Sequence, residues 1–267
     1  CNEFTHARKL LKAGTSRVVT PNNDTLYTNA WLDLSDGPLV MNVPDTAGRY
    51  YVLGFLDFFT NPFAHIGQRL TGTAARRFLI TGPDWRGELP AEFAAPGAHI
   101  QSSTNGVWII GRILVDGEHD IPQVHALQDQ FTLQPLVNGE ANAQAMAQAP
   151  KAFDPQADPK APLTGAEFLT QVNRALAHNP APAGDAALLA RAASLGMGPG
   201  AVPTAAQIAA VDEALPLVKA LLRKGGVGAK TDAAAAERAW VNMPLVTGSF
   251  GDQHLLRARV ALQYIGM

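Results

Sequence analysis

The first half of the chain alternates short apolar runs with clusters of turn-forming residues. Runs rich in Val, Ile, Leu and aromatic side chains lie at 37–45, 48–59, 77–83 and 105–117, each bounded by Gly, Pro, Asp or Asn. Such side chains favour strands, and the bounding residues favour turns. No amphipathic helix separates the runs, which favours antiparallel pairing over parallel βαβ units. The pattern predicts an antiparallel β-sandwich or partial barrel.

One of these strands differs from its neighbours. Residues 50–59 are apolar at nearly every position, except for Gly54 and Asp57. A strand that faces solvent on one side alternates apolar and polar residues, whereas a continuous apolar run is typical of a strand covered on both faces. We therefore expect this strand to be covered on both sides.

Helical patterns begin after the last apolar run. At 120–133, Asp120 is a predicted N-cap, Pro122 lies in the first turn, and apolar residues follow at helical spacing. Residues 137–162 contain Ala, Gln, Pro and Asp with few large apolar side chains, as in a linker or lightly packed arm. The Ala- and Leu-rich remainder predicts helices at 164–177, 184–195, 204–224 and 252–265.

Capping and helix-breaking residues indicate where these helices begin and end. Thr164 and Glu167 have the spacing of a capping box, Pro216 is expected to kink or split the third helix, and three glycines at 225–228 to end it. The chain is thus predicted to be α+β. It has a β-rich domain at 1–136, a linker or arm at 137–162 and a helical region at 163–267.

Composition excludes several classes of function. The 21 basic and 23 acidic residues are interspersed and give a net charge of -2, which argues against nucleic-acid binding. The single cysteine, Cys1, allows no intrachain disulfide and no cysteine-based zinc site. No apolar stretch reaches the ~20 residues that span a bilayer, so no transmembrane segment is predicted. The first residue is Cys and not Met, which indicates a processed chain or a fragment.

The first candidate site is the polar turn at 21–27. Asn22, Asn23 and Asp24 follow Pro21, and such residues bond their own backbone, so Asp24 is expected to accept N–H groups of the next residues. Alternatively, the turn directs these oxygens and the Tyr27 hydroxyl toward a hard cation or a polar substrate. The two interpretations are compatible, because a carboxylate has more lone pairs than one turn uses.

Two further candidates lie in apolar strands. Asp57 stands among four large apolar residues and needs a partner, for which Arg49, Arg112 and the Asn61 amide are the choices. Trp108 and Arg112 are separated by an even offset and therefore share one face of a strand, where Trp108 could form a pocket wall. An arginine on such a face indicates either a buried salt bridge or an anion-binding group.

The remaining catalytic motifs give no positive signal. The seven histidines are scattered, so a histidine metal site would have to be assembled by the fold, and His65 after the 60–64 turn is the best placed. No G-x-S-x-G elbow is present, and Cys1 is the only thiol. Serine- or cysteine-based acyl transfer therefore has no support.

Several short motifs resemble the bacterial family called "domain of unknown function 1254". They are Pro-x-x-Asp-Thr-x-Tyr at 21–27, Gly-Arg-Tyr-Tyr at 48–51, Leu-Asp-x-x-Thr-Asn at 56–61, Gly-Pro-x-Trp-x-Gly at 82–87, and Thr-Asn-x-x-Trp-x-x-Gly-Arg at 104–112. The resemblance covers roughly residues 15–135. It implies recurrent polar positions at Asn22, Asp24, Thr25, Tyr27, Arg49, Asp57, Asn61, Thr104, Asn105 and Arg112.

The resemblance also carries expectations about context. In this family a helical segment usually leads into a second β domain, numbered 1214, which we expect to be missing or truncated here. Members are often exported, which favours a periplasmic or secreted protein, and metal-assisted hydrolysis is one suggested role. A site completed by the second domain would be incomplete in this chain.

Three hypotheses for function follow. The first is a metal-assisted hydrolase of a small polar or anionic substrate, with a divalent cation as candidate cofactor and Asp24 and Asp57 as catalytic residues. Its substrate-binding residues would be Asn22, Tyr27, Arg49, Asn105, Trp108 and Arg112. The second is a non-catalytic ligand-binding or oligomerisation module that binds a small molecule or forms a homo-oligomer. The third is an enzyme that needs the missing domain.

Overall fold

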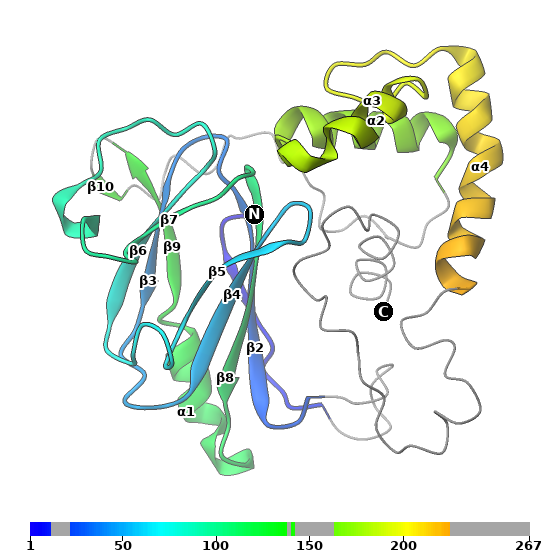
Figure 1. Ribbon diagram of the computed structural model, residues 1–267. Helices are drawn as coiled ribbons and strands as arrows, with labels where there is room; N and C mark the ends of the chain where they lie inside the picture. Colours follow the sequence, from blue (N-terminus) through cyan, green and yellow to red (C-terminus); the bar gives the residue numbers. More distant parts are fainter. Residues whose placement is uncertain (12–21, 138–139, 142–162, 225–267) are drawn as a thin grey trace, which may run out of the picture. The chain divides into compact units, whose positions relative to one another are not determined.

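The computed structural model of the chain describes residues 1–11, 22–137, 140–141 and 163–224 (Figure 1). The chain divides into two compact units. One comprises Cys1–Asp154 with His178–Pro180, and the other comprises Pro155–Ala177 with Ala181–Met267. We call them the β unit and the helical unit.

The β unit contains two five-stranded sheets. Sheet A has the order β1 (Phe4–His6), β2 (Thr25–Asp33), β8 (Gly106–Leu114), β4 (Tyr51–Asp57) and β5 (Pro62–Gly67), with every pair antiparallel (Figure 1). Sheet B has the order β10 (Glu140–Ala141), β9 (Thr132–Val137), β3 (Leu39–Val43), β6 (Arg76–Thr81) and β7 (His99–Gln101). Only the β6–β7 pair is parallel among these described pairs. The predicted α+β class is confirmed, and the sheets do not close into a barrel.

The two sheets share one apolar core. Alternate residues of each strand point inward, so that Leu53, Phe55 and Ile109 of sheet A and Met41 and Phe78 of sheet B join a single buried cluster. This packing follows from the two-residue period of a strand, which places every second side chain on one face.

The outer faces of the two sheets differ. On sheet B, Val40 and Leu79 point outward but are fully buried, because Phe93 and Ala98 pack over them. On β4 of sheet A the outward residues are only half-buried. The described residues thus leave this face half-buried, and cover on both sides stays a prediction.

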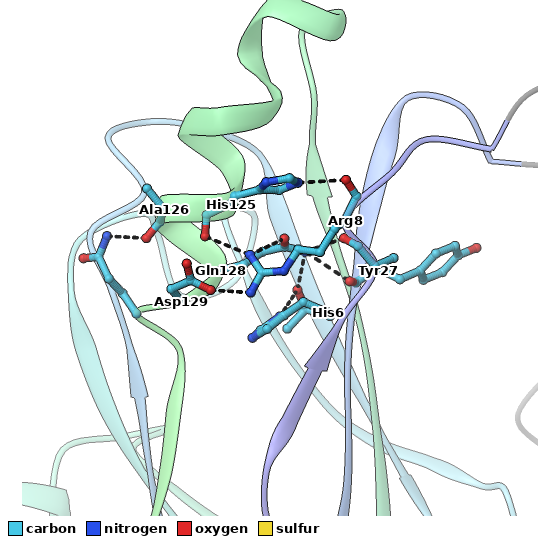
Figure 2. A network of polar contacts seen from close by, with 10 residues as sticks. His6, Arg8, Tyr27, His125, Ala126, Gln128 and Asp129 are labelled. Atoms are coloured by element: carbon cyan, nitrogen blue, oxygen red, sulfur yellow. Dashed lines mark hydrogen bonds and ion pairs between the residues drawn. The ribbon is translucent and has the colours of Figure 1, made fainter.

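A short helix fastens the N-terminal strand to sheet A (Figure 2). Helix α1 spans Ile121–Gln128 and ends with the fully buried Gln128, whose amide donates to the carbonyls of Ala7 and Tyr27. Arg8 donates to the carbonyl of His125 and forms an ion pair with Asp129. The helix is shorter than predicted because Phe131 enters the core and β9 begins directly after it.

The helical unit contains α2 (Gly165–His178, its last residue in the β unit), α3 (Ala186–Ala193) and α4 (Ala205–Lys224). The Thr164–Glu167 capping box is confirmed, because Thr164 Oγ1 accepts from the Glu167 N–H and Glu167 Oε2 accepts from the Thr164 N–H. Helix α4 continues through Pro216 and is not split there, and the alternative of a kink stays a prediction. Among the described residues, no helix combines the length and apolarity needed to cross a membrane.

Several predicted features fall outside the described residues. They are the helix at 252–265, the glycines at 225–228, and most of the linker at 137–162. The first linker positions, up to Ala141, include the end of β9 and all of β10 instead.

Candidate functional site

The turn before β2 is closed by Asn22 and not by Asp24. Asn22 Oδ1 accepts from the backbone N–H groups of Asp24 at 3.3 Å and Thr25 at 3.2 Å, while the side chain of Asp24 is exposed. The prediction of an Asx turn here is correct, but its assignment to Asp24 is wrong. Asn22 is used by the local backbone, and the Asp24 carboxylate faces solvent.

Arg49, a predicted substrate-binding residue, lies in a structural ion pair. Its guanidinium holds both oxygens of Asp120, with Nη2 2.7 Å from Oδ1, and also donates to the Leu114 carbonyl at 2.9 Å. The hydrogen bonds between the two side chains raise the pKa of Arg49 and lower the pKa of Asp120. Asp120 occupies the predicted N-cap position of α1 but makes no side-chain cap bond, because its carboxylate is held by Arg49.

Asp57 is satisfied by its own turn. Its side chain is 6% exposed, and its oxygens accept from the Asn61 N–H at 2.8 Å and from the Asn61 amide at 3.0 Å. The Asn61 amide is thus the partner among the three that the sequence offered. Ser103 Oγ lies 3.5 Å from the same carboxylate, at the long limit of a hydrogen bond.

Asn105 anchors a distant segment of the same unit. Its amide donates to the carbonyl of His178 at 2.7 Å, and the neighbouring Gly106 N–H donates to Asn179 Oδ1 at 2.7 Å. His178 Nε2 is 2.9 Å from Asp33 Oδ1. These bonds hold residues 178–180 against the end of β8, which gives Asn105 a structural role.

The two candidate catalytic carboxylates lie at opposite ends of sheet A. Asp57 pairs with Val107 at one end of β8, whereas the Asp24 carbonyl accepts from the Val115 N–H beyond the other end. The strand between these contacts is roughly 25 Å long at the usual rise per residue. Among the described residues, no group of three His, Cys, Asp or Glu side chains could hold a metal ion. Asp24 and Asp57 therefore do not share a two-metal site, whose ions lie within ~4 Å of each other.

The outer face of sheet A brings together the other predicted residues: Tyr27, Trp108 and Arg112. The strand register places Tyr27 beside Arg112 and Trp31 beside Trp108. The Arg112 guanidinium lies 5.1 Å from the centre of the Tyr27 ring, and the two indoles stack at 5.0 Å with an interplanar angle of 8°. Arg112 is exposed on this face, so the buried salt bridge considered from the sequence is not formed.

Beside this face, residues of the β4–β5 hairpin and the turn after it line a half-open hollow that the sequence analysis did not find. Its volume is about 310 Å³, and we call it the hairpin cavity; it is lined by Tyr50, Tyr51, Val52, His65, Ile66, Gly67, Arg69 and Leu70. No carboxylate lines it, and Arg69 forms no ion pair with any described residue. Leu70 is 72% exposed at its edge. The sequence contains little indication of this cavity, because Arg69 and Leu70 lie in a turn, where no periodic pattern shows which way side chains point.

A second hollow, of about 480 Å³, lies against sheet B. Its cationic groups already have partners, because Arg77 pairs with Glu92 at 2.5 Å and Arg76 donates to the Pro96 carbonyl at 3.0 Å. An anion entering this hollow would compete with Glu92. The hairpin cavity, in contrast, offers a guanidinium that pairs with no described residue, beside apolar walls, and is the better candidate site.

A comparison with solved structures finds a protein of similar fold. The chain is similar to the crystal structure of the VPA0106 protein from Vibrio parahaemolyticus, with 24% sequence identity and a TM-score of 0.65 over 98% of this chain. The match spans 58% of the length of that protein, so the chain corresponds to little more than half of it. No curated protein matches the sequence. The model of the family described as "Protein of unknown function (DUF1254)" matches residues 1–135, and the chain belongs to this family.

Proposed function

We propose that the β unit is a non-catalytic binding module for a small organic carboxylate, which enters the hairpin cavity. The observation that carries this proposal is the lining of the cavity. Apolar side chains and Arg69 meet there without any carboxylate, and His65 adds an imidazole. An arginine fork matches a carboxylate with two parallel hydrogen bonds, and the volume is at the lower end for small-molecule sites.

The turn after β5 supports the proposal by fixing the backbone that carries Arg69. The Gly67 carbonyl accepts from the N–H groups of Leu70 and Thr71, and the Thr71 hydroxyl accepts from the Gly67 N–H. Gly67 has a φ of 149°, and a Cβ there would lie 2.4 Å from the Tyr51 carbonyl oxygen. Because no larger residue fits, the turn can close tightly against β4 and hold Arg69 at the cavity.

The hydrolase hypothesis has less support than binding. It requires Asp24 and Asp57 in one site, and they lie at opposite ends of sheet A. Each is also accounted for locally, Asp24 as an exposed turn residue and Asp57 as the acceptor of Asn61. The predicted homo-oligomer and the periplasmic or secreted location stay predictions.

The proposal is tested by titrating the chain with hexanoate and with hexanamide, which has the same shape without the charge. We expect hexanoate to bind roughly ten- to a hundredfold more tightly, the usual contribution of charged hydrogen bonds. Arg69→Gln should remove this preference. Arg86→Gln is the matched control, because Arg86 donates to the carbonyls of Pro83 and Trp85, away from the cavity. Equal binding of both probes by the unaltered chain would refute the proposal.

A further inference from the structure

We infer that the ligand is an elongated amphipathic carboxylate, whose apolar body leaves the hairpin cavity and lies along the outer face of β4. This inference rests on the proposed carboxylate site and extends it. The surface concerned, which we call the outer strip, consists of the outward-facing Val52, Gly54, Leu56, Trp108 and Ile110.

The outer strip is continuous with the hairpin cavity. Val52 belongs to both, and the His65 side chain connects them, because it lines the cavity and lies over Gly54. The register then continues the surface across to β8, since Gly54 pairs with Ile110 and Leu56 with Trp108. From Val52 to Leu56 the strip extends roughly 13 Å, at the usual rise per residue.

Gly54 lies at the centre of the outer strip, and its backbone does not require glycine. A Cβ at Gly54 would lie 3.6 Å from His65 Cδ2 and 3.8 Å from Ile110 Cγ2, which are ordinary contacts, and its φ is not positive. Glycine in the middle of a strand weakens the sheet, and it often marks a place where a ligand approaches closely. The missing side chain therefore leaves the space of a Cβ, bordered by His65 and Ile110, on the face where the apolar body would lie.

Gly111, on the paired strand β8, differs from Gly54 in the space around it. A Cβ there would lie 2.3 Å from Leu53 Cδ2 and 2.6 Å from the Thr28 carbonyl oxygen, so glycine is required by the packing of the core. No such neighbour restricts Gly54. The two glycines thus differ: core packing requires Gly111, whereas no contact of the described residues requires glycine at position 54.

The positions of the charged and apolar side chains indicate what kind of molecule fits the cavity and the outer strip. The outer strip is apolar, and Arg112 beside Val52 is paired with no described carboxylate; its guanidinium stacks on Tyr27. A cation lies at the cavity end, in Arg69, and apolar side chains follow. This order matches a molecule with a carboxylate head and an apolar body, such as a medium-chain fatty acid or a hydrophobic aromatic acid.

The test compares alkanoates from hexanoate to dodecanoate by calorimetric titration. Burying one methylene group is equivalent to about a fourfold gain in affinity. We therefore expect a gain of up to about fourfold per added methylene until the strip is filled. Tryptophan fluorescence should change with dodecanoate but not with hexanoate, and the change should disappear when Trp31 and Trp108 are both replaced by Phe.

Gly54→Val provides the specific variant. Its added methyl groups should fill the strip without unfolding the sheet, so dodecanoate affinity falls at least tenfold while hexanoate affinity is kept and the melting temperature is kept or raised. Affinity independent of chain length, or equal losses for both probes in Gly54→Val, would overturn the inference and leave the carboxylate site standing. Failure of hexanoate itself to bind would overturn both proposals.

Discussion

Replacing Asp120 by asparagine keeps the shape of the side chain but removes the charge that Arg49 binds. The Asp120 side chain is 6% exposed and that of Arg49 is 21% exposed. The carboxylate also accepts from the Asp116 N–H at 2.8 Å, so its removal affects three donors. Breaking a fully buried pair typically costs about 3–5 kcal/mol. Because Arg49 retains some solvent, we expect Asp120→Asn to lower the free energy of unfolding by about 2–3 kcal/mol.

The matched control is Asp129→Asn, which breaks the same kind of pair at the surface. Arg8 and Asp129 are 38% and 61% exposed, so water and salt screen their attraction. Urea and thermal unfolding followed by circular dichroism measure both variants. Asp120→Asn should lower the melting temperature by roughly 5–10 °C, the shift expected for that free energy in a domain of this size. Asp129→Asn should give no resolvable shift.

The pH dependence gives an independent check of the same pair. The folded pKa of Asp120 is lowered by the hydrogen bond from Arg49, so its stabilisation is complete above the unfolded pKa of about 3.9. This stabilisation is lost as the pH falls through the folded pKa of Asp120. In that range the difference in the free energy of unfolding between the unaltered chain and Asp120→Asn should shrink. If the two asparagine variants unfold alike at neutral pH, the argument from burial is refuted.

Two further predictions concern the attachment of the N-terminal strand. Gln128→Leu leaves the carbonyls of Ala7 and Tyr27 without their buried donor, so we expect a loss of about 2–4 kcal/mol, at ~1–3 kcal/mol per unsatisfied group; a urea midpoint close to that of the unaltered chain would contradict this. Burial, and then nearby Arg8, lower the pKa of His6, so its contribution is complete above the unfolded pKa of about 6.5 and is lost as the pH falls toward the folded value. His6→Gln should therefore flatten the decline in stability between about pH 7.5 and 5.5, and an unchanged slope would exclude His6 as its source.

The sequence predicts the strands well because their evidence is local, but it does not predict how they pair. Strand β2 pairs with β8, so Thr25 lies beside Leu114 although most of the β unit separates them in sequence. No local pattern contains that information. The placement of Asp24 and Asp57 depends on it, which is why an aspartate in a polar turn and an aspartate in an apolar strand could be assigned to one site.

Local periodicity predicted the site residues that share a strand face. Trp108 and Arg112 are four residues apart on β8, and the structure places both on the outer face of sheet A. Arg49 shows the limit of such reasoning. Its partner Asp120 is assigned by the sequence to a helix cap, and only the fold shows that the two side chains meet.

The outward position of Gly54 could have been inferred from the alternation of β4. Leu53 and Phe55 are fully buried, so Gly54 must lie on the opposite face, together with Val52 and Leu56. Gly111, by the same count, shares the inner face of β8 with Ile109 and Ile113, where large neighbours fill its space. An outward glycine between two apolar residues has no packing reason of this kind. The continuous apolar sequence of β4, which suggested a second protein layer, is explained equally well by a surface that binds the apolar part of a ligand.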